Sequence, residues 1–266
     1  MNDYHTSTEQ RYNETNSKIE SSTKNVKPRG NIILNILIFI GWMLLSQMVI
    51  LIIFGILKLS SIFNSFNGAI LTCLFIVIAT IITWLIRRYY IRHSYEERQK
   101  FKLKDIGINI GWAVLLRVLA LAFSYLLHIT TGSGQSENDK MLLGDANHQI
   151  SDASQLPQIF PFLMFILTIS ILTPYLEELI YRGIFKETLF SRAAFWLPLI
   201  LSSLIFALQH SVTDIISILM FMFMGIIFYL AYSRRGNVRD SMMVHMIHNS
   251  TTGIILLIGY FYVLLH

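Results

Sequence analysis

Residues 159–184 read IFPFLMFILTISILTPYLEELIYRGI, an apolar run interrupted by two adjacent carboxylates, Glu177 and Glu178. A bilayer core about 30 Å thick is crossed by roughly 20 apolar residues in a helix, so this run is long enough to span it. Ionisable residues inside such a helix are costly, and they mark a functional site by default. The stretch therefore predicts a membrane-spanning helix and indicates where its chemistry lies.

The rest of the chain repeats the apolar pattern. Of the 266 residues, 54% are hydrophobic and 14% are charged, whereas a soluble domain has roughly 25% charged residues. We expect an all-α, polytopic membrane helix bundle of about seven spans. These are Ile32–Leu57, Gly68–Ile86, Ala113–Thr130, Ile159–Ile184, Ala193–Gln209, Ile215–Tyr232 and Met242–Leu265. Phe101–Trp112 is expected to add an eighth, shallow element that lies in the interface.

One membrane domain with a polar tail accounts for the remaining segments. Residues 1–30 are rich in Asn, Ser, Thr and Glu and are expected to form a disordered tail, while residues 31–266 form a single membrane-embedded domain with its motifs at 159–250. Lys and Arg gather in alternate loops, which predicts a multi-pass cell-membrane protein with a cytoplasmic N-terminus and an outer C-terminus. The long connection Gly132–Gln158 suggests a lid.

Two segments are expected at the membrane interfaces. Arg117 stands near one end of the third span, where its long side chain could snorkel to the head groups. The segment Glu187–Phe195 is predicted to lie along or inside the inner interface.

The Glu-Glu pair is not symmetric along its helix. Glu178 and Arg182 are four residues apart, so they share a face and are expected to form an ion pair. Glu177 points about 100° away and has no equally placed cation. Glu177 is therefore the better candidate for chemistry, and Glu178 with Arg182 for support.

Histidines and an asparagine provide the other candidate groups. His210 follows the fifth span, four residues after Phe206. His245 and Asn249 share one face near the start of the seventh span, and polar groups on one stripe usually face a bundle interior. His248 could join them or face the head groups, and the second placement is favoured.

Two kinds of hydrolytic chemistry fit these residues. Glu177 with His210 can activate a water as general base, while His245 and Asn249 donate hydrogen bonds to a developing oxyanion. Alternatively, Glu177, His210 and His245 ligate zinc. No cofactor is favoured, because the sequence has no HExxH motif and its one cysteine, Cys73, excludes a cysteine-pair zinc site. No aromatic-basic interleaving indicates a nucleic-acid partner.

The order and spacing of the three motifs resemble the CPBP family, the CAAX proteases and bacteriocin-processing enzymes also called Abi. The motifs are Glu177-Glu178-x-x-x-Arg182, Phe206-x-x-x-His210 and His245-x-x-x-Asn249. They stand on separate late spans, within about a third of the chain. Each motif is unspecific alone, and the three in order are specific.

This resemblance implies an all-helical intramembrane endopeptidase that cleaves a membrane-associated peptide or protein. It implies that Glu177 is the catalytic carboxylate, that His210 is its partner on the water, and that His245 and Asn249 form the oxyanion side. It also implies supporting roles for Glu178, Arg182 and Phe206. The family is commonly labelled metalloprotease, although its archaeal relatives look like glutamate-dependent, metal-independent enzymes, and the latter mechanism is favoured here.

Other functions stay open at this point. A catalytically silent member of the fold could regulate a partner such as a sensor kinase or a bacteriocin-immunity factor, and a proton-relay transporter could use the same polar residues. The sequence does not name the substrate or say whether it is prenylated.

The three side chains are predicted to lie at different depths in the membrane, which conflicts with a common site. Counted along straight helices, Glu177 lies about 15 Å from the inner boundary, His245 about 8 Å and His210 about 22 Å. A tilt, a kink at Pro198 or a reentrant stretch at Thr188–Pro198 is needed to bring the three side chains together.

Overall fold

The computed structural model describes residues 31–266 apart from positions 61, 63, 95, 97, 98, 145–155, 191–194 and 211. The predicted disordered tail, residues 1–30, lies outside the described part. The chain divides after Asn35 into two units, of which the first is described only from Asn31. In the first, Asn31 accepts a hydrogen bond from the backbone N–H of Ile33 at the start of a helix. The second unit contains the candidate site.

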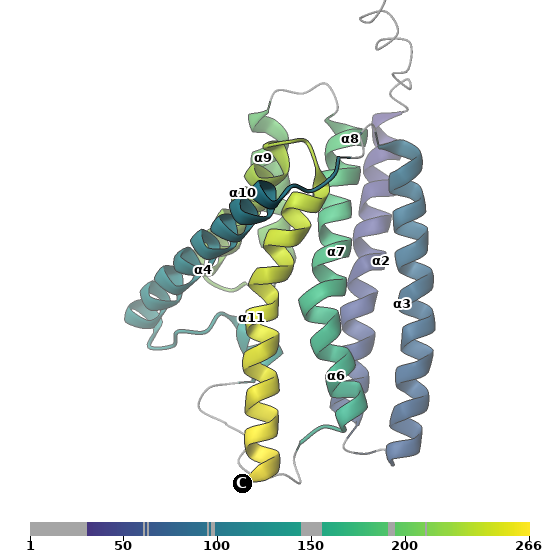
Figure 1. Ribbon diagram of the computed structural model, residues 1–266, viewed down its shortest axis with the longest axis vertical. Helices are drawn as coiled ribbons and strands as arrows, with labels where there is room; N and C mark the ends of the chain where they lie inside the picture. The colour runs from purple at the N-terminus through teal and green to yellow at the C-terminus, as the bar shows by residue number, and fades with distance from the viewer. Residues whose placement is uncertain are drawn as a thin grey trace, which may run out of the picture. The chain divides into compact units, whose positions relative to one another are not determined.

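The described residues are organised in helices (Figure 1). These are α2 (Ile32–Leu59), α3 (Ser65–His93), α4 (Leu103–Thr131), α5 (Glu137–Leu143), α6 (Ile159–Leu167), η2 (Thr168–Leu172), α7 (Thr173–Glu178), η3 (Leu179–Ile184), α8 (Phe185–Leu189), α9 (Trp196–Gln209), α10 (Ile215–Ser233) and α11 (Val238–Leu265). The predicted all-α, multi-pass membrane fold is confirmed.

Six helices in the described part are long and apolar enough to cross a membrane. The fifth predicted span, Ala193–Gln209, is instead the shorter helix α9, which begins at Trp196 and has 14 residues. At roughly 1.5 Å per residue, α9 is about 21 Å long, less than a bilayer core of about 30 Å. His210, which follows α9, is therefore placed within the depth of the bundle.

The predicted separate element at Phe101–Trp112 is wrong. Leu103–Trp112 continues without a break into α4, which has 29 residues. A cap fixes the start of this helix, because the Asp105 side chain accepts a hydrogen bond from the Lys102 N–H at 3.1 Å. In Figure 1, α4 runs obliquely to the direction of α7 and α11.

The fourth predicted span is a single continuous helical run, Ile159–Leu189, made of α6, η2, α7, η3 and α8. Its two π-helical segments, η2 and η3, stand directly before and after α7. Such segments are rare and often occur at functional sites. Here they flank the segment that ends with Glu177 and Glu178. The predicted interfacial stretch Glu187–Phe195 falls partly on α8 and partly outside the described residues, so it stays a prediction.

Apolar side chains divide between the core and an outward surface. Phe165, Leu176, Phe206 and Phe228 are buried at the centre of the bundle. Large apolar side chains on α2, α3, α4 and α11 are exposed, which suits contact with lipid rather than water.

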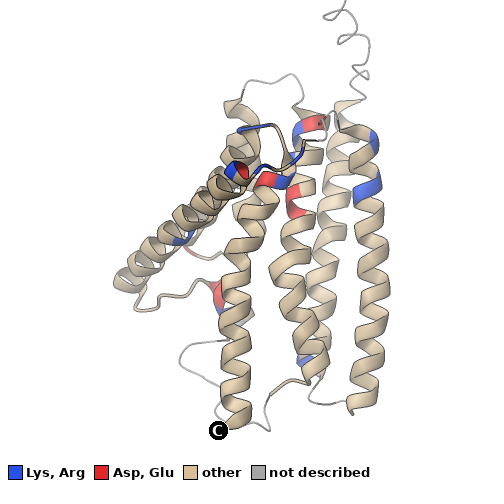
Figure 2. Ribbon diagram, viewed as in Figure 1, with Lys and Arg blue, Asp and Glu red and all other residues tan. Residues whose placement is uncertain are grey.

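Charged residues gather at one end of the bundle, where α4 begins, α8 ends and α10 turns into α11 (Figure 2). Two arginines of that turn, Arg234 and Arg235, bridge Asp105 of α4 to Asp240 of α11 at 2.8–3.2 Å. Asn109 of α4 donates a further hydrogen bond to Asp240 at 2.7 Å. This network ties α4 to α11 and to the turn between α10 and α11.

Candidate active site

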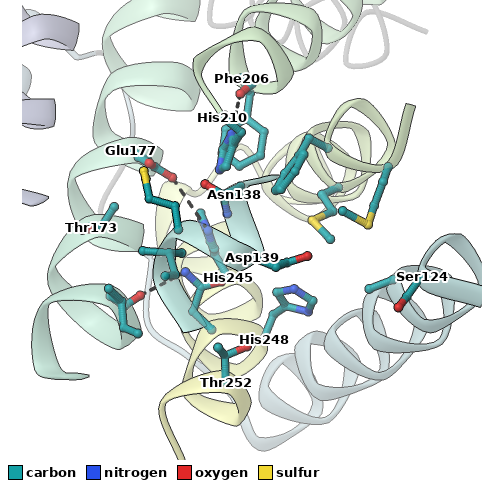
Figure 3. A pocket seen from close by; sticks show the side chains of 18 of the residues that line it. Ser124, Asn138, Asp139, Thr173, Glu177, Phe206, His210, His245, His248 and Thr252 are labelled. Carbon is teal, nitrogen blue, oxygen red and sulfur yellow. Dashed lines mark hydrogen bonds and ion pairs between the residues drawn. The ribbon is translucent and has the colours of Figure 1, made fainter. Parts of the chain in front are cut away.

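A cavity of about 490 Å³ lies among the helices, and all four predicted catalytic residues line it. Figure 3 shows Glu177, His210 and His245 directed into one space. The four residues reach it from α7, from the end of α9 and from α11. The predicted difference in depth therefore does not separate the three side chains.

Glu178 forms the fixed part of the site. Its Oε1 accepts hydrogen bonds from Arg182 Nη1 at 3.1 Å and from His245 Nδ1 at 2.9 Å. Glu178 and Arg182 are both 0% exposed, so the predicted ion pair is fully buried. A buried carboxylate is tolerated when it is paired and hydrogen-bonded. Glu178 meets both conditions through Oε1, whereas its buried Oε2 has no hydrogen-bond partner among the described residues.

Arg182 is held on several sides at once. Nη2 donates to the backbone carbonyl of Gly225 at 2.9 Å, and the guanidinium lies 5.3 Å and 5.4 Å from the ring centres of Phe206 and Phe228. Gly225 allows α9 and α10 to approach closely, since a Cβ there would lie 2.8 Å from Ser203 Cα. Phe206, which was expected to support the site, thus presents its ring to the Arg182 guanidinium.

Glu177 is the less satisfied carboxylate of the pair. Its Oε2 lies 3.8 Å from His245 Nε2, beyond hydrogen-bonding distance. The side chain is 9% exposed and lines the cavity. In the described part of the chain, Glu177 has no guanidinium or ammonium partner within 4 Å. The Glu177 carboxylate is therefore available to accept a hydrogen bond from a molecule inside the cavity.

The hydrogen bonds of the two histidines determine which ring nitrogen carries a proton. His210 Nδ1 lies 2.7 Å from the Phe206 carbonyl, which can only accept, so Nδ1 is protonated. His245 Nδ1 likewise donates to Glu178. In the neutral rings, both Nε2 atoms are left as acceptors. His210 stacks on Phe221 and His245 on Phe228, each with ring centres 4.1 Å apart, which fixes the ring planes.

Asn249, on α11, is held by a hydrogen bond to the facing segment η2. Its Nδ2 donates to the carbonyl of Ile169, in the π-helical segment η2, at 3.0 Å. One amide hydrogen is used in this bond, and a second remains for another acceptor. The close approach of α11 to η2 is permitted by Gly253, where a Cβ would clash with the Ser170 hydroxyl.

Two residues of the cavity were placed wrongly by the sequence reasoning. Arg117 does not snorkel to the interface: it lines the cavity, and Nη2 donates to the carbonyl of His248 at 2.6 Å. His248 is 8% exposed and lines the same cavity, so it does not face the head groups. The long α4 explains Arg117, because a helix that starts at Leu103 places this side chain near its middle.

The long connection Gly132–Gln158 contributes the short helix α5 to the wall of the cavity. Asn138 and Asp139 line it there (Figure 3). Asp139 Oδ2 accepts hydrogen bonds from the backbone N–H and hydroxyl of Ser136, so this carboxylate caps α5. Residues 145–155 lie outside the described part of the chain, so the predicted lid stays a prediction.

The residues present do not form an evident metal centre. Among the described residues, no three of His, Cys, Asp and Glu are grouped so that they could hold a metal ion. His245 uses Nδ1 for Glu178, which leaves Nε2 as the ring nitrogen that could bind a ligand. We therefore derive no step through zinc.

The fold and the site define a multi-pass membrane protein with a buried glutamate–histidine pocket. Residues 159–251 match the family described as type II CAAX prenyl endopeptidase Rce1-like. This segment contains all three motifs, so the chain is similar to that family over about a third of its length.

Three bacterial proteins are similar over a longer stretch. YdiL of Bacillus subtilis, which carries a provisional name as a membrane peptidase, is 26% identical over 64% of each chain. The membrane-embedded CAAX protease MroQ of Staphylococcus aureus is 30% identical over 53% of this chain and 55% of its own. YvdC of Lactococcus lactis is 28% identical over 66% and 65%. The chain thus spans less than two thirds of each relative, and no solved structure matches it.

Proposed function

We propose that this protein is an intramembrane endopeptidase that hydrolyses a peptide bond in a membrane-associated peptide or protein. The observation that carries the proposal is the difference between the two glutamates. Glu178 is bound by Arg182 and His245, whereas Glu177 faces the cavity with only a 3.8 Å contact to His245. The family of residues 159–251 and the names of two relatives support the same class of reaction.

Glu177 acts as the general base in this proposal. Its carboxylate takes a proton from a water, whose oxygen attacks the carbonyl carbon of the scissile bond. The C–N bond then breaks as Glu177 returns that proton to the leaving nitrogen. His210 Nε2 accepts a hydrogen bond from the same water and orients it.

Asn249 and His245 stabilise the negative oxygen of the tetrahedral intermediate. The second amide hydrogen of Asn249 is available for this purpose, because the first is held by Ile169. His245 can donate from Nε2 only as an imidazolium, since Nδ1–H is directed at Glu178. The Glu178 carboxylate stabilises that cation, so Glu178 acts through His245.

The decisive test compares Glu177→Ala and His210→Ala with wild type in cleavage of candidate membrane peptides. We expect a rate loss of about 10²-fold or more for each, the lower range for a positioned acid–base group. His266→Ala is the matched control, because this exposed histidine lies at the end of α11. Cleavage at the wild-type rate by both variants would show that the mechanism is wrong.

Metal content separates the glutamate mechanism from the zinc alternative. We expect purified active protein to keep its activity after chelation. Stoichiometric zinc in wild type that is lost in His210→Ala would overturn the glutamate-only mechanism. A silent regulator, the second function considered, would instead act equally well on its partner in the Glu177→Ala form.

The proposed orientation places the charged end of the bundle, and the N-terminus, in the cytoplasm. The basic residues of the α10–α11 turn and of the segment before α4 support it. Reporter fusions at the C-terminus should report an outer location. A cytoplasmic C-terminus would contradict this topology.

A further inference from the structure

A second cavity, of about 530 Å³, lies at the charged end of the bundle, away from the catalytic pocket. It is lined by residues from the segment before α4, from the first turns of α4 and from the turn between α10 and α11. Its lining is mostly cationic and consists of Gln99, Lys100, Lys102, Lys104, Asp105, Ile108, Arg234 and Arg235. Five cations thus face one carboxylate.

The arginines and the lysines of this cavity differ in their partners. Arg234 and Arg235 are bound to Asp105 and to Asp240 behind it. Lys100, Lys102 and Lys104 are exposed, and no ion pair joins them to a carboxylate in the described part of the chain. The acidic groups are therefore used by the arginines, and three ammonium groups remain for an external anion.

The start of α4 adds to the positive potential. A helix N-terminus carries a partial positive charge of about half a unit, and its first N–H groups favour anions. The chain also closes around the cavity, since Gln99 donates to the carbonyl of Arg235 at 2.9 Å and Arg235 lies over the ring of Phe101 at 5.2 Å.

An apolar surface continues from the cations along the outside of α4. Leu103 is 88% exposed, Ile110 46% and Val114 58%. A soluble phosphate has no use for such a surface, whereas the acyl chains of a phospholipid can lie on it while the head group reaches the lysines. Basic pockets between helix ends at the cytoplasmic side suit anionic head groups in this way.

We propose that this cavity binds the phosphate head group of an anionic phospholipid, with Lys100, Lys102 and Lys104 as its ligands and the acyl chains along α4. The bound lipid holds the start of α4 against the α10–α11 turn. Because α4 also contributes Arg117 to the catalytic pocket, the lipid stabilises the helix that forms one wall of that pocket.

The test measures binding of phosphatidylglycerol and of phosphatidylcholine to the purified full-length protein by native mass spectrometry. One variant combines Lys100→Gln, Lys102→Gln and Lys104→Gln. The matched control combines Arg87→Gln, Arg88→Gln and Arg92→Gln, which removes three cations from the end of α3, outside the cavity. Thermal unfolding in phosphatidylcholine alone verifies that both variants fold.

Wild type should prefer phosphatidylglycerol, and the lysine variant should lose about tenfold or more of that preference, since each basic residue near an anionic surface contributes measurably. The arginine control should keep the preference within about twofold of wild type, because its cations lie outside the cavity. An equal loss in both variants, or none in the lysine variant, overturns the proposal. Displacement of phosphatidylglycerol by millimolar glycerol phosphate would show an anion site without lipid specificity and would also overturn it.

Discussion

In the described part of the chain, two clusters of buried charge are each built around two carboxylates, and they differ in the number of cations that pair with those carboxylates. At the end of the bundle, Asp105 and Asp240 face Arg234 and Arg235, and each of the four carboxylate oxygens accepts a hydrogen bond. In the centre, Arg182 pairs with Glu178, while among the described residues no arginine or lysine lies within 4 Å of Glu177.

The difference indicates which cluster is structural and which is reactive. A buried charge that is paired and hydrogen-bonded is compensated electrostatically, so a structural role explains it. A buried charge without a partner destabilises the fold and therefore indicates a functional role. The end cluster is balanced and joins α4, α10 and α11. The central cluster leaves Glu177 facing a cavity, with two histidines whose Nε2 atoms can accept.

The largest expected effect comes from removing the unbalanced charge. Glu177→Gln should lower the cleavage rate by about 10²–10⁴-fold, because it deletes the general base. It should leave the free energy of unfolding unchanged or raise it, since no ion pair is lost. Cleavage kinetics and thermal unfolding of the same preparation measure both. A folded variant with the wild-type rate would show that Glu177 is not the base.

Removing Arg182, the cation that pairs with Glu178, should break the central cluster altogether. Arg182→Met leaves Glu178 buried without its guanidinium, and losing one partner of a buried pair costs about 3–5 kcal/mol of stability. Chemical unfolding or the yield of folded protein measures this loss. Arg182→Lys is the matched control and should be less destabilised, although a lysine cannot also reach Gly225 in the same fork geometry. A fully stable Arg182→Met would contradict the ion-pair assignment.

The balanced cluster should respond in stability rather than in chemistry. Asp240→Asn removes one charge from a network with several donors and should cost about 1–3 kcal/mol. The cleavage rate of the folded fraction should stay within a few-fold of wild type. A rate loss as large as that of Glu177→Gln, in a folded protein, would remove the distinction between the clusters.

Sequence reasoning located the central cluster because polar residues are conspicuous in apolar helices. Spacing alone predicted the Glu178–Arg182 pair, since residues four apart share a helix face. It could not predict that His245 also binds Glu178, because that contact joins residues from α7 and α11. The same limit applies to the balanced network, whose members come from α4, the α10–α11 turn and α11.

The errors have physical causes in helix length. Composition placed the third span at Ala113, but a capped start at Leu103 extends α4, so Arg117 lies inside rather than at the edge. Because Ala193–Gln209 is apolar, the sequence predicted a fifth helix that crosses the whole membrane. The structure has the shorter helix α9, which is followed directly by His210 beside the cavity. The length of an apolar run therefore does not fix where a helix begins or ends.

The smallest expected effect concerns a third carboxylate, Glu96, which hydrogen bonds support from two sides. Its Oε2 accepts from the Tyr90 hydroxyl at 2.5 Å and from the Val238 N–H at 3.1 Å, which joins α3 to the start of α11. Partial burial nevertheless raises the pKa of Glu96 above its usual value, and this exceeds the opposing effect of the hydrogen bonds.

A raised carboxyl pKa means that folding favours the protonated form of Glu96. This contribution to stability is present below the ordinary pKa of glutamate and is lost as pH rises through that value to the raised one. Glu96→Gln should therefore flatten the pH dependence of unfolding in that window. The change at neutral pH should be about 0.5 kcal/mol or less, because water screens a half-buried charge. If the free energy of unfolding depends on pH as steeply in Glu96→Gln as in wild type, another group causes that dependence. Glu137→Gln, on the exposed side of α5, is the matched control.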